Sequence, residues 1–407
     1  MLKKMLQSMF IQPKYHDKIL HYTIILLGIF GIVMQVSASM FTNTDYSSWS
    51  LIILTIKQIA FFVAGFIAMN LVANYFSFEL SKKIIIYFMV ITIILLLITR
   101  LFGSVGGSYG WIKLVVFNQQ VTIQPSEFAK LIMIVVMALY LGDKKEGKWY
   151  KLIIVPFIFF MISATIIAFY QNDMGSAMVF VLITFFCFII PTNRSLLPSQ
   201  IVALILAALF IYSLYYLTTP SGLQLLENLN ISDYQLTRFR AVQFPFYDKF
   251  AKGYFDLNNS LIGFSRGDLF GVGLGKSILK YSNISAAPTD FIMEVIVEEL
   301  GFMGFIYVLV GYLALTYRLI IQAIKINGEK NKIIMIGVMM YFVLHFIFNI
   351  GGVICLLPLT GIPLLLISAG GSSTLSAMMA IGFVQALISK NTEDKLKRRS
   401  IYADNSR

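Results

Sequence analysis

Runs of about 20 consecutive apolar residues recur along this chain and are separated by mostly short polar stretches. A helix of that length crosses the roughly 30 Å hydrocarbon core of a bilayer, so each run predicts a membrane-spanning helix. The ten predicted spans are 19–41, 51–75, 84–102, 125–142, 151–171, 175–192, 199–219, 290–317, 332–357 and 364–389. The pattern therefore predicts an all-α integral membrane protein with ten transmembrane helices.

The loops between these spans alternate in charge. Lysine and arginine collect in 1–18, 82–83, 144–151, 194, 318–332 and 390–407. The opposing loops 42–50, 171–173 and 358–363 contain neither residue. Because short cytoplasmic loops carry the excess of Lys and Arg, both chain termini are predicted to be cytoplasmic.

One connection is much longer than the rest. Residues 220–289 join the seventh and eighth spans on the predicted outer side, and the segment is aromatic and punctuated by glycine. Long loops of this kind are usually functional, and the positive-inside rule does not constrain them. The predicted organisation is a cytoplasmic basic arm (1–18), a single membrane domain (19–389) that includes this extracellular loop, and a cytoplasmic basic tail (390–407).

Composition agrees with a membrane protein and removes several other classes. Hydrophobic residues make up 58% of the chain and charged residues 13%, with mean hydropathy +0.80. The formal net charge of +12 comes from basic residues beside hydrophobic spans, where they meet anionic lipid headgroups, so no nucleic-acid partner is expected. Two cysteines and three scattered histidines give neither a disulfide framework nor zinc-ligand spacing.

Three carboxylates stand at the outer end of the eighth predicted span. Asp290, Glu294 and Glu298 are four residues apart, which predicts that they share one helical face. A carboxylate at membrane depth costs roughly 2.5–3.5 kcal/mol on insertion scales, so such a stripe indicates a functional site. Asp290 is the first candidate for chemistry.

Four more ionisable residues are predicted at the same depth as Asp290: Lys57, Glu127, Lys130 and Asp173. Their convergence predicts an outward-facing polar cavity, because each charge in lipid needs a partner. Each has a plainer alternative. Lys57 is also suited to an interfacial anchor, Glu127 and Lys130 to a self-satisfied helical pair, and Asp173 to a helix N-cap.

The long loop contains SRGDLFGVGLGKS at 265–277, which is rich in glycine. It lacks the GxxxxGK[ST] spacing of a nucleotide-binding loop. Two interpretations remain open: its backbone N–H groups receive a pyrophosphate, or its glycines only permit tight turns.

Several motifs in order resemble the SEDS family (shape, elongation, division and sporulation), the FtsW, RodA and SpoVE group. They are VSAS (36–39), GGSYGWI (106–112), QPSEFAK (124–130), QNDMGSA (171–177), RFRAVQFPFYD (238–248), DLFGVGLG (268–275), PTDF (288–291), EELG (298–301) and NIGGVICLLPLTGIPLLLISAGGSS (349–373). The residue sequences of the GGSYGWI and VTIQPSEF segments resemble FtsW more than RodA.

The resemblance implies a peptidoglycan glycosyltransferase that polymerises lipid II into glycan strands at the outer face of the bacterial cytoplasmic membrane, for division or elongation. It implies a class B penicillin-binding protein as transpeptidase partner, together with other divisome or elongasome membrane proteins. Through the PTDF match, Asp290 inherits the family's essential aspartate. Glu127, Lys130 and Asp173 inherit supporting roles by their own motifs, and Lys57 with Gln58 resembles the family's basic position in the second span.

The expected reaction is a single inverting displacement. Asp290 is the candidate general base. Lys57, Lys130 or a loop arginine such as Arg238 would neutralise the pyrophosphate. Whether a divalent ion such as Mg²⁺ or Mn²⁺ assists these cations is left open. The alternative function is a lipid II flippase. A flippase needs polar residues on both sides of the midplane, whereas the ionisable residues here gather on the outer side, which favours the enzyme.

The chain departs from the family pattern in three places, one of which is the usual run of small residues that Arg266 and Asp268 interrupt. This chain has SAAPTDF (285–291) where the family usually has PExHTDF, so Ser285, Ala286 and Pro288 replace proline, glutamate and histidine. Near the tenth span, Leu365 replaces a usual proline and Ala369 a usual tyrosine. Any role of the replaced side chains is absent or relocated in this protein.

Overall fold

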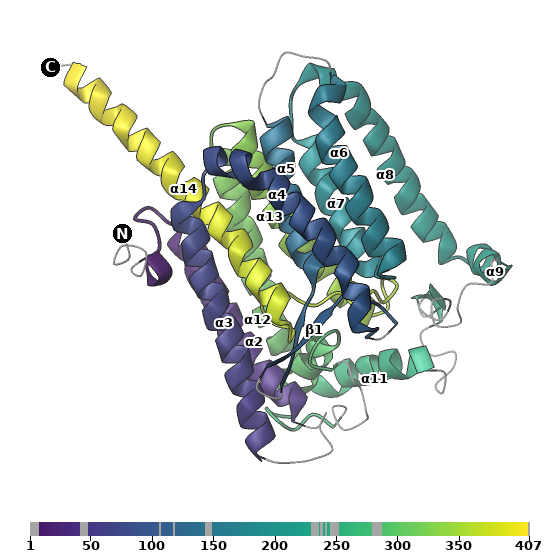
Figure 1. Cartoon of the computed structure of the whole chain (residues 1–407). Helices are drawn as coiled ribbons and strands as arrows, with labels where there is room; N and C mark the ends of the chain where they lie inside the picture. Colours follow the sequence, from purple (N-terminus) through teal and green to yellow (C-terminus); the bar gives the residue numbers. More distant parts are fainter. Residues whose placement is uncertain are drawn as a thin grey trace.

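The protein is a bundle of long helices (Figure 1). A computed structural model describes residues 8–40, 48–105, 107–116, 119–142, 149–228, 236, 239–240, 242–244, 252–278 and 287–405. The helices are α2 (Lys18–Ser39), α3 (Ser48–Tyr75), α4 (Phe78–Ile98), α5 (Pro125–Leu141), α6 (Trp149–Thr165), α7 (Met174–Ile189), α8 (Leu197–Leu217), α9 (Pro220–Asn228), α11 (Lys252–Gly267), α12 (Ile292–Lys325), α13 (Glu329–Val353) and α14 (Gly371–Asn405). Short helical turns are η1 (Thr99–Phe102), η2 (Ile166–Tyr170) and η3 (Arg194–Leu196).

The prediction of a helical membrane protein is confirmed. Within the described residues, eight helical segments are long and apolar enough to cross a bilayer. The helices α5, with 17 residues, and α7, with 16, fall short of that length, although both coincide with predicted spans. The count of ten spans therefore stays a prediction.

A β-hairpin departs from the all-α prediction. Strands β1 (Ile112–Val116) and β2 (Gln119–Ile123) pair antiparallel, with Ile112 opposite Ile123. Each strand is short and rich in β-branched residues, which suits a sheet but is far below the length of a span. A scan for 20-residue apolar runs passes over such an element. The hairpin precedes α5 at the same end of the bundle as α11 (Figure 1).

The tenth predicted span begins seven residues too early, because α14 begins at Gly371 rather than at residue 364. Residues 354–370, here called the buried loop, are not helical, although the side chains of 362 and 364–368 are buried. Non-helical backbone at membrane depth requires internal hydrogen-bond partners. Side chains supply them: Asn349 donates to Ile362 O, Tyr312 to Leu365 O, and Gln35 to Ile367 O and Ser368 O, at 2.7–3.1 Å.

At its other end, α14 continues to Asn405 through the segment predicted as a separate tail from residue 390. Its last turns project beyond the bundle (Figure 1).

Helix α12 is broken at Gly301, which has φ 69°. The glycine-rich loop after α11 fits into this break: Val272 N donates to Glu298 O at 2.9 Å and Gly273 N to Glu299 O at 3.0 Å. A Cβ on Gly301 would lie 2.4 Å from backbone atoms of that loop. The N–H groups of Val272 and Gly273 are thus committed to helix carbonyls rather than open to a pyrophosphate, which supports the turn interpretation for this part of the loop.

Candidate functional site

Asp290 lies in the turn that precedes α12, and its side chain is half-buried. The spacing predicted that Asp290, Glu294 and Glu298 share one helical face. That prediction is wrong for Asp290, because the helix begins only at Ile292. The amide of Asn349 donates 2.9 Å hydrogen bonds both to Asp290 O and to Ile362 O. Asp290 is thereby fixed against the buried loop by its own backbone.

The close approach of the buried loop to the Asp290 carboxylate depends on a glycine. Gly361 has φ 68°, and a Cβ there would lie 3.3 Å from Asp290 Oδ2. A larger residue would strain the backbone and crowd the carboxylate.

The two deeper carboxylates of the stripe hold neighbouring segments in place. Glu294 is 1% exposed and accepts a 2.7 Å hydrogen bond from Ser260 Oγ of α11. Glu298 is fully buried and accepts from Ser277 Oγ and, at 3.1 Å, from Ile278 N. Both groups therefore anchor the outer loop to α12.

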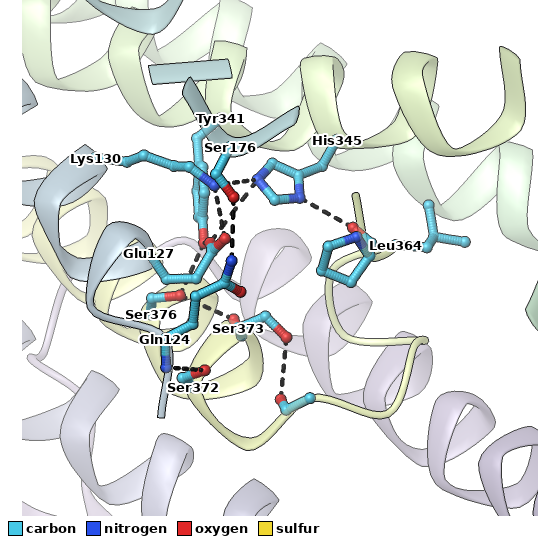
Figure 2. Close-up of polar contacts among 12 residues, drawn as sticks. Gln124, Glu127, Lys130, Ser176, Tyr341, His345, Leu364, Ser372, Ser373 and Ser376 are labelled. Atoms are coloured by element: carbon cyan, nitrogen blue, oxygen red, sulfur yellow. Dashed lines mark hydrogen bonds and ion pairs between the residues drawn. The ribbon is translucent and has the colours of Figure 1, made fainter. Parts of the chain in front are cut away.

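Glu127 and Lys130 belong to a buried polar network (Figure 2). Lys130 Nζ lies 2.6 Å from Glu127 Oε1 and donates to His345 Nε2 at 3.2 Å. Tyr341 OH donates to Glu127 Oε2 at 2.6 Å and is 2.8 Å from Ser376 Oγ. The Glu127 and Lys130 side chains are 0% and 1% exposed, so they form a satisfied internal pair rather than the wall of an open cavity.

The histidine ring connects this network to the buried loop. His345 Nδ1 lies 2.9 Å from Pro363 O, and a carbonyl oxygen can only accept, so Nδ1 carries the proton. Nε2 is then free to accept from the Lys130 ammonium, which assigns a neutral ring. The arrangement links α5 through α13 to the segment that contacts Asp290.

Asp173 is the N-cap of α7. Its sequence context left this role open beside a place in the polar cavity. Its Oδ1 accepts from Ser176 N at 3.0 Å, and its Oδ2 accepts from Gln124 Nε2 at 3.0 Å. Gly175, in the first turn, lies so close to the buried loop that a Cβ would be 2.4 Å from Thr360 O. The start of α7 and Asp290 thus both meet the buried loop.

Two predicted site residues remain, Lys57 and Arg238. Lys57 is half-buried on α3, which packs against α14 and α2. Arg238 lies outside the described residues. Hard divalent cations need several oxygen ligands, and no group of three His, Cys, Asp or Glu side chains converges within the described ranges. The proposed Mg²⁺ or Mn²⁺ ion stays a prediction.

Comparison with known proteins identifies the family. The model of the FtsW, RodA and SpoVE family, described as "Cell cycle protein", matches residues 17–393. The chain belongs to the FtsW/RodA/SpoVE family. It is 30% identical to the probable peptidoglycan glycosyltransferase FtsW of Bacillus subtilis (strain 168), covering 98% of this chain and 96% of that one. It is also 30% identical to stage V sporulation protein E of the same organism, covering 88% and 93%.

Two solved structures share the fold of this FtsW/RodA/SpoVE protein. One comes from work on the structural coordination of polymerization and crosslinking by a peptidoglycan synthase complex, with TM-score 0.69, 20% identity, and 93% and 99% of the two chains covered. The other is the rod shape determining protein RodA of Thermus thermophilus, with TM-score 0.61, 18% identity, and 93% and 98% covered.

The sequence interpretation missed three site residues of this FtsW/RodA/SpoVE protein. Tyr341, His345 and Asn349 are four residues apart on α13, so they form a polar stripe inside an apolar span. The same spacing argument that singled out Asp290 would have found them.

Two departures from the family pattern also prove to be neighbours. Ala369 N donates to Pro288 O at 2.8 Å. The replaced positions of the PTDF turn and of the buried loop are therefore in direct backbone contact.

Proposed function

We propose that this protein is a peptidoglycan glycosyltransferase that polymerises lipid II at the outer face of the cytoplasmic membrane. The observation that carries the proposal is the half-buried Asp290, whose backbone carbonyl is held by Asn349 beside the buried loop at the predicted outer end of the bundle. The names of the FtsW relatives support the same reaction.

In the proposed step, the 4-hydroxyl oxygen of the acceptor sugar attacks the anomeric carbon of the growing glycan. The C–O bond to undecaprenyl pyrophosphate breaks, and the hydroxyl proton passes to Asp290. A positioned general base of this kind contributes about 10²–10⁴-fold to a rate. Lys57 and Arg238 are the cations proposed to neutralise the leaving pyrophosphate.

Lys130 has a different part in this proposal. It is 1% exposed and bonded to Glu127 and His345, so it does not reach substrate. Its ammonium instead fixes His345 and, through Pro363 O, the loop beneath Asp290. Asp173 supports the other side of that loop by starting α7 there.

The proposed topology has ten spans, with both termini in the cytoplasm and residues 220–289 outside. The alternation of basic loops supports it. A class B penicillin-binding protein is the proposed transpeptidase partner, among other division or elongation proteins. A structural relative studied in a peptidoglycan synthase complex supports such a partner, and the FtsW relatives favour division.

The test is a polymer assay with purified protein and lipid II. Asp290→Ala and Asp290→Asn are expected to lower the rate at least 100-fold, because the base is lost. Asp268→Asn is the matched control: Asp268 is an exposed aspartate with φ 45°, a conformation that asparagine tolerates. Undiminished polymer from folded Asp290 variants would remove the base assignment.

Reconstitution separates the enzyme from the alternative flippase. Liposomes that present lipid II only on the outward-facing leaflet should yield polymer from wild-type protein. Transfer of lipid II between leaflets without any polymer would favour the flippase instead.

A further inference from the structure

A cavity of about 330 Å³ lies at the end of the bundle opposite Asp290. It is open on one side and is lined by the start of α4, the turn between α12 and α13, and the extension of α14 beyond residue 387, whose charged side chains are exposed. On the proposed orientation this is the cytoplasmic membrane surface. Its volume equals that of about ten water molecules at roughly 30 Å³ each, which is ample for a phosphate group.

The charge of the lining is predominantly positive. Lys330, Lys390, Lys395 and Arg398 face two carboxylates, Glu329 and Asp394.

Two of the cations from α14, Lys390 and Arg398, lie on one helical face with the carboxylate of Asp394 between them. Lys390, Asp394 and Arg398 recur every four residues, which places them in line over the α12–α13 turn. The eight helical steps from Lys390 to Arg398 rise about 12 Å, so the line extends from the end of the apolar segment through the headgroup layer.

Some of the charged groups are already engaged. Glu329 accepts a hydrogen bond from the Thr192 hydroxyl, and Lys395 Nζ donates to Lys325 O at 2.9 Å. In the part of the chain that the structure describes, Lys390 and Arg398 have no carboxylate partner. The lining therefore carries four cations against two carboxylates, and this excess of positive charge is suited to a bound anion.

The floor of the cavity is firmly built. Gly142 at the end of α5 approaches Lys330 so closely that a Cβ would lie 2.6 Å from Lys330 Cα. The Lys330 ammonium lies over the Phe78 ring, 5.6 Å from its centre. The apolar ring and the helix ends give the site a fixed wall on the bundle side.

We propose that this cavity binds the phosphate headgroup of an anionic phospholipid from the inner leaflet. Basic pockets between membrane helices on the cytoplasmic side are suited to such headgroups, and the adjoining apolar spans accommodate the acyl chains. The inference rests on the proposed orientation but not on the proposed chemistry, so failure of the polymer assay would leave it standing.

The test is native mass spectrometry of the full-length protein with cardiolipin or phosphatidylcholine added to the micelle. Each cation near an anionic headgroup is worth roughly fivefold in affinity, so Lys390→Gln/Arg398→Gln should weaken cardiolipin binding about 30-fold. Lys82→Gln/Lys83→Gln, which removes two exposed cations from α4 outside the cavity lining, should leave binding unchanged.

Two further arms distinguish the source of the anion. Millimolar inorganic phosphate should compete weakly while cardiolipin remains bound, whereas phosphate that binds as tightly as the lipid would overturn a lipid site. Equal cardiolipin retention by the double variant, or equal loss in the α4 control, would also overturn the proposal. The proposal would also be overturned if Lys390→Gln/Arg398→Gln kept its cardiolipin but lost an acidic protein that co-purifies with the wild type, because the site would then bind protein rather than lipid.

Discussion

Removing the ammonium of Lys130 leaves a carboxylate buried without its cation. Lys130 Nζ and Glu127 Oε1 are 2.6 Å apart, with side chains 1% and 0% exposed, so solvent cannot compensate for the loss. Breaking such a pair costs about 3–5 kcal/mol, whereas replacing both partners by neutral residues of similar volume is often close to neutral. Lys130→Met should therefore lower the free energy of unfolding by about 3–5 kcal/mol, and Glu127→Gln/Lys130→Met should recover most of that loss.

Equilibrium unfolding in mixed micelles, followed with a thiol-reactive fluorescent dye, measures these changes. Cys187 and Cys355 are both buried in the fold, so the dye reports unfolding. Lys397→Met is the control, because Lys397 pairs with Glu393 at 2.7 Å but is 67% exposed, and no measurable change is expected. A double variant as unstable as Lys130→Met alone would refute the coupling.

Three further predictions concern other parts of the structure. His345→Ala should lower kcat for polymerisation about tenfold at unchanged KM. His345→Gln should retain most activity, because an amide can donate to Pro363 O and accept from the Lys130 ammonium. Equal loss of activity in both variants would contradict the positioning role. Gly301→Ala should destabilise the protein by about 3 kcal/mol in the unfolding assay, because φ is 69° and the added Cβ meets backbone atoms at 2.4 Å; wild-type stability would refute this. Burial alone would raise the pKa of Asp17, but hydrogen bonds from Arg318, Gln322 and the start of α2 lower it below 3.8. Its ionised form therefore stabilises the fold above about pH 4, and this contribution is lost as pH falls through the lower folded-state pKa. Asp17→Asn should reduce stability at pH 7 and flatten the acid limb of an unfolding profile, and an unchanged limb would contradict the assignment.

The membrane helices were predictable from sequence because crossing a bilayer imposes a local requirement. About 20 apolar residues suffice, whatever the neighbouring helices are, so each predicted run overlaps a helix. Helix boundaries were less predictable where an apolar run continues into buried, non-helical backbone. That happens at 364–370, whose hydrogen-bond partners belong to distant helices and leave no mark on the local pattern.

The candidate site was predictable only in part, for the same reason. The Glu127 and Lys130 pair is three residues apart in sequence, and the structure joins them as that spacing allowed. Tyr341 and His345 complete the network from more than 210 residues away, and no local spacing connects them to α5. Asp290 stays a candidate on its sequence motif alone, and its place in a turn before α12 depends on contacts with the buried loop.

The buried loop also imposes an order on biogenesis. Its backbone carbonyls are satisfied by Gln35, Tyr312, His345 and Asn349, and the bonds from Gln35 span up to 333 residues of sequence. Contacts so distant in sequence must wait until the intervening chain has been made and packed. The loop can therefore reach its final shape only after α2, α12 and α13 have been inserted and assembled. The surface beneath Asp290 is consequently among the last parts of the protein to mature, so a truncated or misassembled chain in the membrane would not present a competent site.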